Sequence, residues 1–161
     1  MNNKSIQFTK LIISILVAQA AGLIGALFTT PNINPWYTGL VKPALNPPSW
    51  IFAPVWTTLY VMMGVALHFA WSRHAEKRRR TLWIRLFLAQ LVVNALWSFV
   101  FFGQHLLLPA LGVIVLLWVM ILTLIVLARR FDVHVAYLLI PYLAWVSFAS
   151  YLNFAIWSLN P

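Results

Sequence analysis

The chain has 161 residues, of which 63% are hydrophobic and only 8% charged, and its 11 basic residues far outnumber its two acidic ones. This composition excludes an ordinary water-soluble domain, because too little polar surface is left to face water. The sequence contains no cysteine, which excludes disulfides, thiolate metal sites and cysteine nucleophiles. Long, continuous apolar runs are typical of membrane helices and not of β-barrel strands, so we expect an all-α membrane protein.

The first apolar run, residues 11–28, is long enough to cross a membrane as a helix, which takes roughly 20 apolar residues. Lys4 and Lys10 precede it, so a secretory signal peptide is the alternative prediction. The run is longer than a usual signal core, and no small-residue cleavage site follows it before Pro31. These features favour a helix that stays in the membrane.

The same run carries small residues at helical spacing, which lets another helix approach closely. They are Ala18, Ala21, Gly22, Gly25 and Ala26. This pattern predicts close helix packing, either within the bundle or against a second copy in a homodimer.

Residues 29–50 form the one long connection that the sequence predicts, and they are rich in proline and aromatic residues. The stretch holds Pro31, Pro35, Pro43, Pro47 and Pro48 together with Trp36, Tyr37 and Trp50. Proline fixes its own backbone and restricts its neighbour, so a stiff, structured loop is expected. Two interpretations stay open: a lid over a pocket, or a belt of aromatic side chains at the membrane interface.

Four further apolar runs follow, at residues 51–71, 84–102, 109–128 and 135–157. The third and fourth spans come from one uncharged stretch, residues 86–128, which is about twice as long as a bilayer core requires and must fold back. Gly103, Gln104 and His105, just before Pro109, mark the turn. The sequence thus predicts a five-helix transmembrane bundle in which residues 1–161 form a single membrane domain.

Basic residues are distributed unevenly between the predicted connections. One side of the membrane receives Lys4, Lys10, Arg73, Lys77, Arg78, Arg79, Arg80, Arg85, Arg129 and Arg130, and only Lys42 falls on the other. The positive-inside rule therefore predicts a cytoplasmic N-terminus and a C-terminus outside. The basic run at residues 77–80 is expected to lie near anionic lipid headgroups, and a nucleic-acid partner is not expected.

The sequence offers few candidates for conventional catalysis. Glu76 and Asp132 are its only acids, and both fall in predicted cytoplasmic loops. His68 is the one ionisable residue predicted at membrane depth, where a packed or interfacial role is the simpler interpretation. The histidines lack metal-ligand spacing, so no metal site is expected.

Polar and aromatic residues instead fall on single faces of three predicted spans. The stripes are Trp56, Tyr60, Met63 and Leu67 on the second span, Gln90, Asn94, Trp97 and Phe101 on the third, and Trp145, Phe148, Ala149 and Leu152 on the fifth. An amide is disfavoured against lipid and turns inward. The stripes predict an aromatic cavity beneath the first connection, suited to a large, flat, mostly apolar ligand, with plain helix–helix packing as the alternative.

Several motifs, in order along almost the whole chain, resemble one known family. They are Trp36-Tyr37-x-x-Leu40-x-Lys42-Pro43, Pro47-Pro48-x-Trp50, Pro54-x-Trp56-x-x-Leu59-Tyr60, Gln90-Leu91-x-x-Asn94-x-x-Trp97, Phe101-Phe102-Gly103 and Pro141-Tyr142-Leu143-Ala144-Trp145-x-x-Phe148-Ala149-x-x-Leu152-Asn153. In these motifs the chain is similar to the TspO/MBR family of translocator proteins, also called peripheral-type benzodiazepine receptors. The resemblance implies a five-helix bundle, usually dimeric, that binds porphyrins such as protoporphyrin IX and haem, sterols in some members, and aromatic drugs under the first loop.

The stripes and the resemblance together give a set of expected ligand-binding residues. They are Trp36, Tyr37, Trp50, Trp56, Tyr60, Gln90, Asn94, Trp97, Trp145, Phe148, Ala149 and Leu152. Trp56 and Trp145 correspond by motif to the two tryptophans that the family associates with porphyrin breakdown, and they are the expected catalytic residues if such breakdown occurs. The resemblance implies no required cofactor, with protoporphyrin IX or haem as the ligand.

The function that the resemblance implies is a tetrapyrrole-binding sensor, chaperone or regulator of porphyrin levels in a stress response. The alternatives are a light- and oxygen-dependent porphyrin-degrading enzyme and a transporter of porphyrins or other apolar ligands. The sterol motif of animal members needs a basic residue after an aromatic one near the end of the fifth helix, whereas Phe154 and residues 158–161 supply none. This departure and the short C-terminus favour a bacterial member, in the cell membrane, without that mode of sterol recognition.

Overall fold

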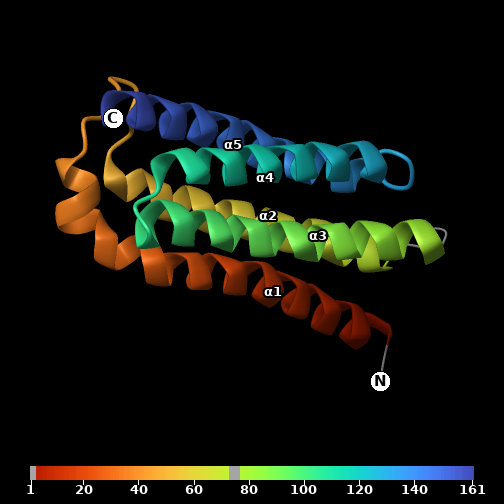
Figure 1. Ribbon diagram of the computed structural model, residues 1–161. Helices are drawn as coiled ribbons and strands as arrows, with labels where there is room; N and C mark the ends of the chain where they lie inside the picture. Colours follow the sequence, from red (N-terminus) through yellow and green to blue (C-terminus); the bar gives the residue numbers. More distant parts are fainter. Residues whose placement is uncertain (1–2, 73–76) are drawn as a thin grey trace.

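Five long helices account for most of the computed structural model, which describes residues 3–72 and 77–161 (Figure 1). They are α1 (Asn3–Asn32), α2 (Phe52–Ser72), α3 (Lys77–Ser98), α4 (Leu107–Ala128) and α5 (Val133–Leu159). Among the described residues there is no strand, and five helices are long and apolar enough to cross a membrane. The structure therefore confirms the predicted all-α fold with five candidate spans.

The helices close into a ring of neighbours. α1 packs against α2 and α3, α5 packs against α2 and α4, and α3 packs against α4. Successive helices run in opposite directions, so the N-terminus and the α4–α5 turn lie at one end and the C-terminus lies at the other, beside the connection from α1 to α2 (Figure 1). The assignment of the first end to the cytoplasm stays a prediction, and Arg73, on which it partly rests, lies outside the described residues.

The connection after α1 contains more helix than the sequence predicted. Instead of a loop over residues 29–50, α1 continues to Asn32 and is followed by a π-helical turn, η1 (Ile33–Tyr37), so that only residues 38–48 separate it from the short 3₁₀ turn η2 (Ser49–Ile51). Asn34 is extended, with φ −116° and ψ 131°, as expected for a residue that precedes proline. Pro31 is accommodated within α1, because a helix in apolar surroundings keeps its other backbone hydrogen bonds at little cost.

α3 ends in a second π-helical turn, η3 (Phe99–Gly103). The chain then turns sharply through residues 104–106, with His105 in the left-handed region at φ 57°. The amide N–H of Gln104 donates to the carbonyl of Phe99 at 2.9 Å, which closes the end of the helix. The structure thus places the break between the third and fourth spans where Gly103 and Pro109 predict it.

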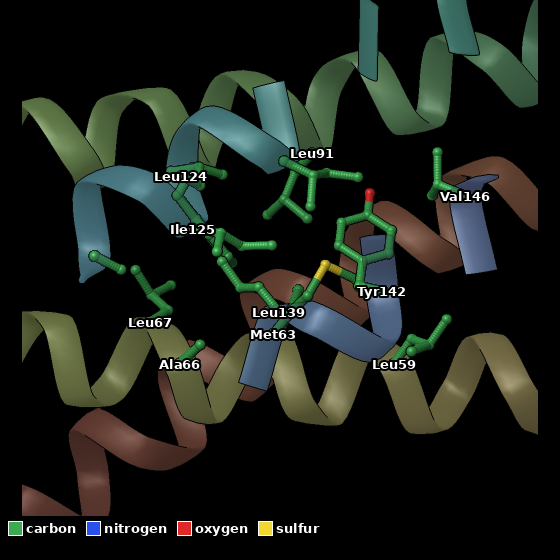
Figure 2. Packing of buried hydrophobic residues seen from close by; sticks show 14 of the residues in the cluster. Leu59, Met63, Ala66, Leu67, Leu91, Leu124, Ile125, Leu139, Tyr142 and Val146 are labelled. Atoms are coloured by element: carbon green, nitrogen blue, oxygen red, sulfur yellow. The ribbon is translucent and has the colours of Figure 1, made fainter. Parts of the chain in front are cut away.

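The half of the bundle near the N-terminus is filled by apolar side chains. Trp83 and Phe87 of α3 are completely buried and stack at 5.2 Å between ring centroids, and the indole N–H of Trp83 donates to the carbonyl of Leu124. Figure 2 shows part of this core, in which Met63 of α2 and Leu139 of α5 are buried together. This half of the bundle is therefore densely packed with apolar side chains.

Glycines allow α1 to lie close to its neighbours. A Cβ atom at Gly64 of α2 would collide with the backbone of Ile15, and one at Gly22 would collide with the ring of Tyr60. A Cβ at Gly25 would lie 3.0 Å from the hydroxyl oxygen of Ser98 in α3. The small-residue face of α1 therefore serves packing within the bundle.

This placement describes where the residues predicted for a homodimer contact lie, while the dimer itself stays a prediction. Ala18, Ala21 and Gly25 are buried within the chain, and Gly22 faces Tyr60. Only Ala26 of the predicted set is exposed. A dimer contact through α1 remains a prediction, and of the predicted residues Ala26 is the exposed one that could take part in it.

Candidate functional site

A cavity of about 300 Å³ lies between α1, α2, α3 and α5, at the end of the bundle that carries the C-terminus. Eight of the predicted ligand-binding residues line it: Tyr37, Trp56, Tyr60, Asn94, Trp97, Trp145, Ala149 and Leu152. The stripes on the second, third and fifth spans therefore face a common space, and do not only pack against one another. The lining residues include no charged side chain and no histidine.

Aromatic rings form most of the wall. Trp56 stacks on Tyr60 of the same helix, with 5.6 Å between ring centroids. Trp145 of α5 meets the ring of Phe52 edge-on at 5.9 Å. Trp97 of α3 packs against Phe101 at 5.2 Å. Because these rings hold one another in place, the cavity offers broad, preformed apolar surfaces.

A buried chain of hydrogen bonds forms the floor. The hydroxyl of Tyr60 donates to Oδ1 of Asn94 at 2.5 Å, and Nδ2 of Asn94 donates to the hydroxyl of Tyr142 at 2.9 Å. That hydroxyl in turn donates to Oε1 of Gln90 at 2.9 Å, and Gln90 Nε2 points at the sulfur of Met63 at 3.9 Å. The two amides therefore join α2, α3 and α5, and each amide nitrogen and oxygen already has one partner.

The indole N–H of Trp145 is different, because it is buried without a hydrogen-bond partner. The indole N–H of Trp97, by contrast, donates to Oδ1 of Asn153 at 3.0 Å, and that amide also donates to the carbonyl of Leu107. A buried donor without a partner is costly, and it is uncommon in folded proteins. The N–H of Trp145 is therefore an unpaired donor buried within the wall, and it is not exposed to the cavity.

The connection from η1 to η2 lies at the end of the cavity that Tyr37 and Ser49 line, and we call it the roof. It leaves η1 at Tyr37, runs to the end of α5 beside the C-terminus and returns to α2 (Figure 1). The hydroxyl of Tyr37 donates to Oδ1 of Asn46 at 2.9 Å. The backbone of Val41 makes two hydrogen bonds to the side chain of Asn160, with its N–H donating at 3.0 Å and its carbonyl accepting at 2.9 Å. The loop is thus fastened to α5.

Most of the exposed lining residues lie on α1 and α2. Leu23 and Thr30 of α1 and Ala53 of α2 line the cavity and are exposed. Further along, Gln19 Nε2 donates to the carbonyl of Thr57 at 3.2 Å and closes the seam between these helices. The cavity therefore opens sideways between α1 and α2, in the part of the protein that faces membrane lipid.

Four residues predicted to bind ligand do not line the cavity. Trp36 stacks on His105 at 4.1 Å on the outer side of the Phe101 and Phe102 rings, and Trp50 is 73% exposed in η2. Gln90 is fully buried one turn below Asn94, since the polar stripe of α3 extends beyond the cavity. Phe148 points away from the cavity lining and packs between the rings of Trp145 and Tyr151.

The sequence reasoning missed the contribution of α1. The cavity is also lined by Gln19, Gly22, Gly25, Ala26, Thr29, Thr30 and Ile33. The small residues among them were interpreted as packing positions, yet beyond their contacts with Tyr60 and Ser98 they leave space unfilled. The signal that could have found them is the recurrence of Gly, Ala and Thr at positions 22, 26 and 30, one face of the helix without a bulky side chain.

Comparison with known proteins agrees with this architecture. The TspO/MBR family matches residues 14–158. The chain is 44% identical over 155 residues to the tryptophan-rich protein TspO of Chlorobaculum tepidum, covering 96% of this chain and 98% of that protein. It is 35% identical over 125 residues to the tryptophan-rich sensory protein of Cereibacter sphaeroides, covering 78% and 77%. It is 34% identical over 146 residues to the translocator protein of Bos taurus, covering 90% and 86%. The chain therefore belongs to the TspO/MBR family.

Proposed function

We propose that the cavity binds a tetrapyrrole such as protoporphyrin IX and that the protein acts as a sensor, chaperone or regulator of porphyrin levels. The observation that carries this proposal is a preformed hollow with aromatic walls and an uncharged lining. Flat apolar rings bind such surfaces through burial and stacking. Because the cavity is open between α1 and α2, part of a porphyrin can extend out of it, so the ligand can be larger than the enclosed volume. The name "sensory protein" of a relative supports the sensor role.

The lining favours a metal-free porphyrin over haem. Haem iron in proteins is held by histidine, cysteine, methionine or tyrosine. Among the described residues, the lining offers no histidine or methionine, and its two tyrosine hydroxyls already donate to Asn46 and Asn94. We therefore expect the ring to be held by its faces and not through a bound metal.

Binding can be tested by titrating the purified protein with protoporphyrin IX and following the quenching of tryptophan fluorescence. The double substitution Trp56→Phe/Trp145→Phe is expected to raise the dissociation constant about tenfold, because the smaller rings bury less apolar surface against the ligand, at about 25 cal/mol per Å². The matched control is Trp71→Phe/Trp118→Phe, two tryptophans that do not line the cavity. An equal loss in both double variants, or quenching that does not saturate, would contradict the proposal.

A second candidate function, oxidation of the bound ring, is favoured by one observation: Trp56 and Trp145 line the same cavity. Illumination of the complex in air separates the two functions. A binder returns the porphyrin with an unchanged spectrum, whereas an enzyme removes the main porphyrin absorption band at a rate that depends on oxygen and on both tryptophans. A flux assay in proteoliposomes distinguishes transport from binding and from oxidation. Transport is the role that the name "translocator protein" supports for the bovine relative.

For the setting of this activity we propose a bacterial cell membrane, with the N-terminus in the cytoplasm. The uneven distribution of basic residues supports this orientation. The cavity then opens in the outer half of the bilayer.

A further inference from the structure

The roof of the cavity carries one positive charge. Lys42 lies in the loop between η1 and η2, whereas the other basic residues on the described elements lie near the opposite end of the bundle, on α1, on α3 or after α4. Its ammonium group stands over the ring of Tyr37, with Nζ 4.9 Å from the ring centroid. The ring of Tyr37 is 6% exposed and lines the cavity. The charge is therefore one side chain away from the cavity.

This charge has no acidic partner among the described residues. Asp132, the one acid that the structure describes, caps the N-terminus of α5, where its carboxylate accepts from the N–H of His134. Lys42 lies beside the other end of that helix, whose 27 residues span about 40 Å at 1.5 Å each. The positive charge at the roof is therefore available to a ligand.

The ammonium group is held in place and keeps one donor free. Nζ donates to the carbonyls of Thr38 at 3.1 Å and Leu40 at 3.0 Å, and an ammonium group has three donors. The neighbouring residue, Val41, is fastened to Asn160 of α5 by two hydrogen bonds. A preorganised cation loses little freedom when it binds an anion, which strengthens the interaction.

From this arrangement we infer that Lys42 receives a carboxylate of the bound ring at the roof. The inference rests on the proposed tetrapyrrole binding and adds an orientation to it, with the ring inside and the acid groups at the loop. The lining cannot accept the acid groups, because a carboxylate buried there would meet no positive charge. At the roof a carboxylate stays partly hydrated and pairs with the ammonium group.

Two ligands that differ only in charge test this inference. Protoporphyrin IX carries two propionates, and its dimethyl ester carries none. In nanodiscs of phosphatidylcholine, the unmodified protein is expected to bind the free acid about tenfold more tightly than the ester. Lys42→Met is expected to remove that preference by weakening binding of the acid while leaving the ester unchanged. The matched control is Lys10→Met, which also removes an ammonium group over an aromatic ring, that of Trp71, at the other end of the bundle.

Each outcome has one meaning. A preference that persists in Lys42→Met, or that is lost equally in Lys10→Met, overturns the inference. Equal weakening of acid and ester by Lys42→Met also overturns it, because it shows that the lysine only supports the loop. Equal binding of acid and ester by the unmodified protein overturns the role of Lys42 and leaves the proposed function standing. Saturable binding of neither compound overturns the proposed function itself.

Discussion

Replacing Gly64 with alanine is expected to lower the free energy of unfolding of the bundle by about 1–3 kcal/mol, the usual cost of overpacking. The added Cβ would lie 2.5 Å from Cα of Ile15 and 2.9 Å from its backbone nitrogen. A flexible side chain could move aside, but here the neighbour is the backbone of α1. Relief therefore requires that the whole helix shift away from α2.

The same change should also reach the cavity, because α1 supplies one of its walls. We expect weaker protoporphyrin IX binding together with the lower stability. Unfolding in increasing fractions of SDS, followed by tryptophan fluorescence, measures the first effect and porphyrin titration measures the second. Gly112→Ala is the control, since a Cβ there meets nothing within 4 Å. Equal stability of the two variants would show that α1 and α2 are not in this close contact.

Replacing Tyr142 with phenylalanine is expected to cost about 2 kcal/mol of stability, since each buried polar group left without a partner costs about 1–3 kcal/mol. Tyr142 is 1% exposed, and its hydroxyl lies between Asn94 and Gln90 of α3. Figure 2 shows this hydroxyl pointing from α5 toward α3. Its removal leaves one donor of Asn94 and one acceptor of Gln90 unpaired in apolar surroundings.

The matched control for this change is Tyr137→Phe, on the same helix. Tyr137 is 58% exposed, so its hydroxyl can be removed without leaving a buried group unpaired. We expect Tyr137→Phe to unfold at the same SDS fraction as the unmodified protein and Tyr142→Phe to unfold earlier. Coincident unfolding curves would mean that the hydrogen-bonded floor does not stabilise the bundle.

The positions of the helices could be predicted closely from sequence, since the thickness of a bilayer fixes how long an apolar run must be. The predicted span 51–71 agrees with α2 (Phe52–Ser72) within one residue at each end. The predicted span 109–128 agrees with α4 (Leu107–Ala128) within two residues. The end of α1 could not be predicted in this way. In a soluble protein, Pro31 and Pro35 would be expected to end the helix. In a membrane the helix continues, because a backbone group without a hydrogen bond costs more where water is scarce.

The site was predicted in outline, because periodicity shows which face of a helix turns inward. It does not show how far along that face a cavity extends, and so Gln90 was included although it lies in the packed floor. Nor does it show where space is left empty. The hollow depends on Gly22, Gly25 and Ala26, whose helical spacing predicts either close packing or empty space, and which of the two it is becomes visible only when the helices are assembled.

The two hydrogen bonds between Asn160 and Val41 bear on how a molecule would reach the cavity. With the roof fastened, the route from bulk water is covered, while the gap between α1 and α2 faces hydrocarbon chains. If the ligand is a porphyrin as proposed, occupancy of the site would therefore depend on how strongly that compound partitions into the bilayer. The bound fraction would then follow the amount of pigment dissolved in the surrounding lipid, even when almost none is free in solution.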